Sequence, residues 1–361
     1  MKRKFSFLLC LLLPLLALGN TGDEAFKRTE VKTYSVSNGA QLKVSNKYGQ
    51  IVIHTWNKNE IKATVTITGF GKSDAESQNI VSSVSISGKQ VDNSVSLSTD
   101  YNPGGSGSRW FNFGSNKNSK DYVSIDYDIY VPQSLQMAFF DNNFGDLVVG
   151  DKITFPIKFT LNYGNYDIRD AGDVQLTVNY CSKGRIGKAG AVNLRSNYSD
   201  MKAESIRSLS AVSTYSTCAI GAVGDATIKA TYDDYKLEDV GSLNLVGTYT
   251  DVVAAGLRED LTATLTYGDL KVRKIATTFK GANIRMTYSD AKLTFARRVP
   301  LQLDFHFVYG GIKTGSMELK NVISDKKSVK WDYTALANGG TEQSPKIRAS
   351  GTNGDISIDV E

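Results

Sequence analysis

Aspartates recur at one fixed place in this 361-residue chain, two positions after a repeated tyrosine. They are Asp200, Asp234, Asp251, Asp269 and Asp290. Stacked carboxylates could bind Ca²⁺, which prefers several oxygen ligands. Aspartate is also common in tight turns, because its side chain bonds to nearby backbone. The column is interrupted by Asn165 and Thr217, and the nine-residue repeat of calcium-binding β-rolls is absent. We therefore predict a role in turns and no metal site.

Paired carboxylates could also supply the acid and the base of glycoside cleavage. Asp233 with Asp234, or Asp200 with Asp234, are candidate pairs, but nothing selects one pair among the 37 acidic residues. The only histidines, His54 and His306, fall on the outward phase of their expected strands, so a histidine triad or a multi-histidine zinc site is hard to build. We predict a non-enzymatic protein with no catalytic residues and no cofactor, and keep a polysaccharide-cleaving β-helix enzyme as the alternative.

Two cysteines lie beyond the N-terminal apolar segment, Cys181 and Cys218. If each repeat forms one coil, they are two coils and roughly 9.6 Å apart. A disulfide needs Cα atoms within roughly 7 Å. The spacing therefore predicts two free thiols, in the core or in turns.

Exposed aromatic side chains on loops are typical of recognition sites. Trp110, Phe111 and Phe113 lie in the glycine- and serine-rich segment 102–120. They are the candidate ligand-binding residues, and the alternative is that they fold back and plug one end of the structure.

The elements that would position these residues follow from the tyrosine repeat. Its members are Tyr163, Tyr180, Tyr198, Tyr215, Tyr232, Tyr249, Tyr267 and Tyr288, spaced 17 to 21 residues apart. Each ends an alternating run and is followed by a polar turn and a second short run. Residues two apart share one face of a strand, so Tyr232 should lie on the same inward face as Ala230 and Ile228. After the turn the third and fifth positions, such as Tyr235 and Leu237, should also point inward.

Repeats of about 20 residues that hold two strands and no helix predict a β-solenoid. We expect an all-β, right-handed parallel β-solenoid (β-helix) of about twelve short coils, with an inward tyrosine ladder along its axis. Residues 57–130 interrupt the stack with further strand-like runs and a short helix from Ser73 to Ser82, capped by Ser73 with Glu76 three residues later. We interpret this insertion as an antiparallel β-rich N-terminal cap, and residues 315–345 as a C-terminal capping insertion.

The domain organisation expected is a signal peptide at 1–19, a first coil plus cap at 20–130 and the solenoid at 131–361. Lys2, Arg3 and Lys4 precede an apolar run from Phe5 to Leu18, which is typical of secretory signals. The only early cysteine, Cys10, lies inside this run, which argues against a lipid anchor. The remainder holds 39 basic and 37 acidic residues, a net charge of +2. We expect an exported protein without a transmembrane segment after cleavage and without a nucleic-acid partner.

The chain resembles the bacterial putative-adhesin family, a family of exported proteins of unknown function. The resemblance is carried by coils such as 267–270 (Tyr-Gly-Asp-Leu) and 288–291 (Tyr-Ser-Asp-Ala), and by residues 126–132, which lead into Phe144. It covers most of residues 31–361 and implies adhesion. Our own hypothesis is that the partners are glycans or envelope and matrix components. A structural or sensing module of the envelope that binds another protein is the further alternative.

Overall fold

The computed structural model describes residues 24–102 and 122–361. The signal-peptide expectation and the candidate residues Trp110, Phe111 and Phe113 fall outside these ranges. Strands dominate the described chain, in which one short helix accompanies a single 27-stranded sheet. No helix in the described ranges is long and apolar enough to cross a membrane. The all-β class is therefore confirmed.

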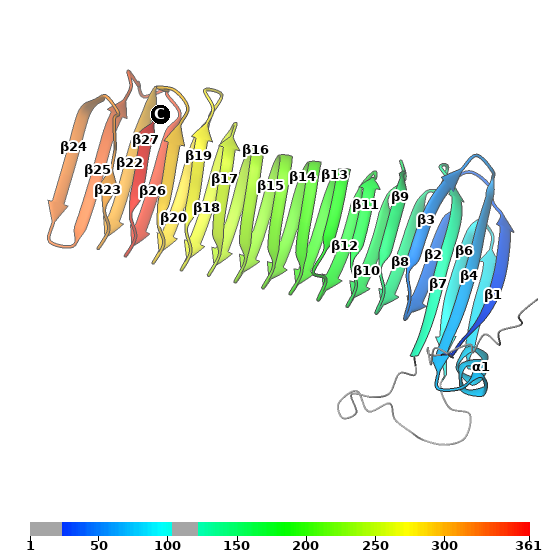
Figure 1. The fold of residues 1–361 in the computed structure, drawn as a ribbon. Helices are drawn as coiled ribbons and strands as arrows, with labels where there is room; N and C mark the ends of the chain where they lie inside the picture. Colours follow the sequence, from blue (N-terminus) through cyan, green and yellow to red (C-terminus); the bar gives the residue numbers. More distant parts are fainter. Residues whose placement is uncertain (1–23, 103–121) are drawn as a thin grey trace, which may run out of the picture.

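Parallel strands stacked side by side form the long body of the molecule (Figure 1). In its middle each strand pairs with the strand one repeat further on. Leu209 lies opposite Ala226, and Ala226 lies opposite Leu243, in each case a shift of 17 residues. The strands of the body are β8 (Met137–Asn143), β9 (Leu147–Lys152), β10 (Ile157–Asn162), β11 (Tyr166–Asp170), β12 (Val174–Asn179), β13 (Gly184–Asn197), β14 (Asp200–Thr214), β15 (Thr217–Thr231), β16 (Asp234–Thr248), β17 (Asp251–Leu257), β18 (Asp260–Thr266), β19 (Leu270–Ile275), β20 (Gly281–Thr287) and β21 (Ala291–Phe295).

The two short strands predicted for each repeat are fused in β13 to β16, which contain 14 or 15 residues each. Gly224 lies in the middle of one of these continuous strands, β15. A Cβ atom on Gly224 would lie 2.5 Å from the carbonyl oxygen of Arg207 in the coil before it. Only glycine permits so close an approach of two backbones.

Antiparallel strands cover the N-terminal end. There β4 (Glu60–Gly71) pairs antiparallel with β1 (Glu24–Ser35) and with β7 (Tyr122–Pro132), and β5 (Val84–Val91) pairs antiparallel with β6 (Ser94–Tyr101). Strands β2 (Gln41–Lys47) and β3 (Ile51–Trp56) join them to the body by parallel pairing. Helix α1 (Asp74–Ser82) packs against β4 and β1, and the Ser73 hydroxyl accepts a hydrogen bond from the Glu76 amide, so the predicted helix and its cap are confirmed.

The C-terminal end departs from sequence order. Strands β26 (Lys346–Thr352) and β27 (Ile356–Val360) lie between the coil of β20 and β21 and the coil of β22 (Leu301–Val308) and β23 (Ile312–Lys313). Beyond β22, the hairpin of β24 (Leu319–Lys327) and β25 (Lys330–Ala337) continues the sheet antiparallel (Figure 1). The last strands of the chain are thus inserted into the stack.

The interior is filled by the alternating positions that the sequence indicated. Ala226, Ile228 and Ala230 before the turn, and Tyr235 and Leu237 after it, are all at most 5% exposed. The repeated tyrosines are the exception, because they lie on the outside. The predicted inward tyrosine ladder is wrong.

Candidate functional site

A row of aromatic rings runs along the outer edge of the stack. We call it the aromatic ladder. Its members are Tyr48, Phe144, Tyr163, Tyr180, Tyr198, Tyr215, Tyr232, Tyr249, Tyr267 and Tyr288. From Phe144 to Tyr288 these residues are 39–53% exposed. The feature interpreted as core is therefore a surface.

The backbone explains why the rings point outward. Every ladder residue has a positive φ, for example 51° at Tyr215 and 59° at Tyr232. The rule that residues two apart share a face holds only for extended backbone. A left-handed residue at the end of the strand breaks this alternation and turns its side chain to solvent. Bulky residues rarely adopt this conformation, and here it recurs in successive coils.

The rings stack on one another almost in parallel. Consecutive ring centroids are 4.7–5.4 Å apart and the ring planes differ by 1–14°. This spacing matches the distance between neighbouring strands, about 4.8 Å. Each inner ring therefore has both faces covered by its neighbours. The ladder offers ring edges and phenolic hydroxyls to a partner, and it does not offer flat faces on which sugars could stack.

The residue immediately before most ladder residues carries an amide or a hydroxyl, and these side chains form a column along one side of the ladder. Nδ2 of Asn162 donates to Oδ1 of Asn143 at 2.6 Å, and the same bond joins Asn179 to Asn162 at 2.7 Å and Asn197 to Asn179 at 2.8 Å. Threonines continue the column at Thr214, Thr231, Thr248, Thr266 and Thr287. Each bonded amide keeps a second N–H available to solvent or to a partner.

The turn aspartates flank the ladder on its other side. Backbone N–H groups of Asp269, Asp290 and Asp355 donate to Oδ1 of Asp251, Asp269 and Asp290, at 2.8, 3.0 and 2.7 Å. The aspartates thus hold the turns together, as predicted, but by bonding to the backbone of the next coil. The described ranges contain no group of three or more His, Cys, Asp or Glu residues placed to hold a metal.

Beneath the ladder, the residue that follows the tyrosine is buried in six coils, a feature that the sequence did not predict. These residues are Cys181, Ser199, Ser216, Asp233, Thr250 and Ser289. The backbone N–H of Ser199 donates to Ser216 Oγ at 3.3 Å, that of Ser216 to Asp233 Oδ1 at 2.6 Å, and that of Asp233 to Thr250 Oγ1 at 3.4 Å. The available signal was residue size, since glycine, serine, cysteine or threonine fills this position in most coils.

Asp233 is the one carboxylate in this buried column, and it is only 4% exposed. Burial raises its pKa above the ordinary value, while hydrogen bonds from the Ser213 hydroxyl at 2.7 Å and the backbone N–H groups of Ser216 and Thr231 act in the opposite direction. Its neighbour Asp234 is exposed on the other side of the strand. The candidate pair of Asp233 and Asp234 therefore does not converge on one cleft.

The cysteines and histidines lie as expected. Cys181 and Cys218 are free and buried, and burial raises the pKa of Cys218 to about 12, so its thiol is not reactive. At the N-terminal end, Nε2 of His54 lies 3.1 Å from Oδ1 of Asp128. His306 lies between Asp304 and Asp332 at the other end, with its ring nitrogens 3.1 and 2.7 Å from the carboxylate oxygens of these two residues.

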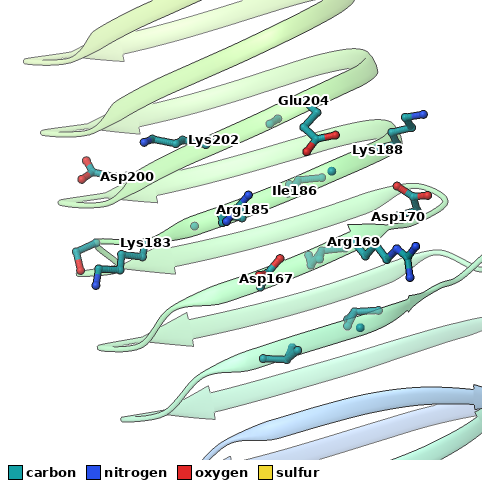
Figure 2. Close-up of a pocket in the computed structure, with 18 residues that line it drawn as sticks. Asp167, Arg169, Asp170, Lys183, Arg185, Ile186, Lys188, Asp200, Lys202 and Glu204 are labelled. Atoms are coloured by element: carbon teal, nitrogen blue, oxygen red, sulfur yellow. The ribbon is translucent and has the colours of Figure 1, made fainter.

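A hollow of about 1080 Å³ lies on the face of the stack that is formed by β9, β11, β13 and β14. Figure 2 shows charged side chains of both signs along these strands, among them Asp167, Arg169, Arg185, Lys202 and Glu204. Five basic and four acidic residues line the hollow, so their charges nearly cancel. A surface with nearly balanced charges has little net electrostatic attraction for a polyanion.

No protein-family model and no curated protein matches the chain. Solved structures similar to it include a putative adhesin from Parabacteroides merdae (12% identity, TM-score 0.38) and a putative adhesin from Parabacteroides distasonis (14%, 0.35). A putative lipid binding protein from Parabacteroides distasonis is also similar (12%, 0.28). Each match covers 72% of this chain and 92% of the other. Proteins described as putative adhesins are thus among the solved structures to which the chain is similar.

Proposed function

We propose that this chain is an exported, non-enzymatic binding protein of the adhesin type, and that the aromatic ladder is its interaction surface. In this proposal a signal peptide at 1–19 directs export to the periplasm, the cell surface or the medium. Residues 20–130 form the first coil and its cap. Together with that first coil, residues 131–361 form a right-handed β-solenoid of about twelve coils, with 315–345 capping its far end.

The observation that carries the proposal is the exposure of nine consecutive stacked rings, from Phe144 to Tyr288. If each ring exposes about half of a side chain of roughly 200 Å², the ladder presents about 900 Å². Contiguous apolar patches on monomeric proteins rarely exceed a few hundred Å², and larger ones mark interaction sites. A surface of this size therefore favours a partner over plain solvent.

The chemistry along the ladder suits a partner that can exchange hydrogen bonds. Phenolic hydroxyls both donate and accept, asparagine amides do the same, and aspartates accept. Glycans, envelope or matrix components and other proteins all carry groups of these kinds. The turn acids already bond to backbone, as Asp251 does with the Asp269 amide, which supports a binding role over acid–base catalysis.

Substitution of three central rings tests the proposal. Asparagine tolerates a positive φ, and Asn353 occupies the equivalent position of its own coil with φ 53°. The triple variant Tyr198→Asn, Tyr215→Asn, Tyr232→Asn should therefore keep the fold. We expect the mature protein to be retained on an array of glycans, envelope or matrix components and immobilised proteins that include the protein itself, and the triple variant to lose this retention.

A matched control is offered by β24, where Val322 and Ile323 are 48% and 67% exposed. The double variant Val322→Asn, Ile323→Asn removes exposed apolar side chains at the end of the stack and should bind like the wild type. Equal retention of the triple variant and the wild type would refute the ladder as the binding surface.

A further inference from the structure

We infer that the partner of the aromatic ladder is a second copy of this chain, bound side by side, parallel and in register. The inference rests on the proposed function, in that it takes the ladder to be an interaction surface. It goes further by identifying what binds there.

The ladder is regularly spaced, which restricts the partners that can touch all of it. Centroid distances from Tyr163 to Tyr288 stay within 4.7–5.2 Å, and the ring planes turn by at most 12° at any step. A partner that touches every ring must repeat at the same distance along a nearly straight line. A second copy has this repeat by construction and can match the ladder over its whole length.

The ladder is also complementary to itself. Because ring faces are covered within the stack, the groups that meet a partner are edges and hydroxyls. A phenolic hydroxyl both donates and accepts a hydrogen bond, so it can pair with the same group on a second copy. Contact of one patch with an identical patch is the arrangement found in two-fold dimers, the commonest homo-oligomers.

The flanking columns decide the orientation. One side of the ladder carries neutral side chains such as Asn197 and Thr214, and the other carries carboxylates such as Asp234 and Asp251. A two-fold axis along the stack places the carboxylates of one copy opposite the neutral donors of the other. A two-fold axis across the stack places carboxylates opposite carboxylates, which like-charge repulsion disfavours. The parallel pair, with each coil facing its own counterpart, is therefore favoured.

The area agrees with a stable pair. About 900 Å² of exposed ring surface on each copy gives about 1,800 Å² in total. Stable specific interfaces bury about 1,200–2,000 Å². The rings alone therefore provide an interface of ordinary size.

Sedimentation velocity over a range of micromolar concentrations tests the pairing. We expect the wild type to be a dimer and the triple variant Tyr198→Asn, Tyr215→Asn, Tyr232→Asn to associate at least about tenfold more weakly, since aromatic residues at the centre of an interface carry much of its affinity. The control Val322→Asn, Ile323→Asn should remain a dimer. A monomeric wild type, or a triple variant that dimerises normally, would overturn the inference.

Cross-linking with a bis-maleimide tests the orientation. Cysteine is introduced near one end of the ladder in Tyr163→Cys and near the other in Tyr267→Cys, while the native Cys181 and Cys218 are buried. In the parallel pair each variant should cross-link to itself. The two positions are six steps, about 29 Å, apart, so an antiparallel pair would cross-link only when the two variants are mixed, and that result would refute the parallel arrangement.

The retention array separates this inference from the function on which it rests. A monomeric wild type whose retention depends on the ladder would remove the second copy as the partner and leave the proposed function intact. A monomeric wild type with no retention on any component would contradict both.

Discussion

Replacing Tyr166 by phenylalanine should stabilise the protein, whereas the same change at Tyr235 should destabilise it. Both tyrosines occupy the third position after a ladder residue, and both are 1% exposed. The Tyr166 hydroxyl has no hydrogen-bond partner among the described residues. The Tyr235 hydroxyl shares a 2.7 Å hydrogen bond with Ser213 Oγ. Burial raises the pKa of both hydroxyls well above the ordinary value, so both are protonated at neutral pH.

The expected magnitudes follow from the state of each hydroxyl. A buried polar group without a partner costs about 1–3 kcal/mol. Removing the Tyr166 oxygen relieves this cost but leaves a small void, so we expect a gain of about 1 kcal/mol in unfolding free energy. Removing the Tyr235 oxygen loses its hydrogen bond with Ser213 and a second one with the Cys218 thiol, which together cost about 1 kcal/mol. Ser213 keeps its bond to Asp233, so the cost should not rise much further. The two variants should therefore differ by about 2 kcal/mol.

Urea unfolding followed by circular dichroism measures this difference. Stacked repeats can unfold in stages, so the comparison requires that the slopes of the transitions agree between the variants. The same substitution at equivalent positions of two coils makes each variant the control for the other. If Tyr166→Phe lowered stability as much as Tyr235→Phe does, the Tyr166 hydroxyl would have a partner, such as a buried water, and the reasoning would be refuted.

Two further predictions concern the same interior. Burial raises the pKa of Asp233 in the folded protein. The stability linked to its protonated form should therefore be lost as the pH rises from about 4 through the raised folded-state pKa. Asp233→Asn cannot ionise and should lack this loss in urea titrations across the same pH range. A Cβ atom on Gly184 would overlap the ring of Tyr166, so Gly184→Ala should cost about 1–3 kcal/mol in unfolding free energy. A smaller cost when Tyr166→Leu is combined with it would identify the overlap as the cause, and equal costs in both backgrounds would contradict it.

The repeat by itself determined most of the fold. A period of 17 or 18 residues and alternating apolar positions predicted parallel strands one repeat apart, as found for Ile228 opposite Leu245. Both side chains are buried, because alternation along an extended strand places every second residue inside. The helix capped by Ser73 followed from equally local reasoning, and the free thiols followed from the spacing of the repeats.

The side on which the tyrosines lie could not be obtained by counting residues. Alternation fails at a residue with positive φ, and tyrosine carries no local preference for that conformation. A hint was present in Asn353, which fills the same place in its coil and belongs to a residue type that adopts positive φ more readily. The insertion of β26 between β20 and β22 was equally hidden, because it depends on which distant strands pair.

The sequence by itself thus determined which residues form strands and which of them are buried, because both follow from the local period. Only the tertiary structure decided what the surface presents. Left-handed residues in successive coils turn the rings outward, and coil stacking brings them face to face. A ladder exists only when many coils are aligned, because each ring contributes a single edge and the continuous surface arises from their common spacing.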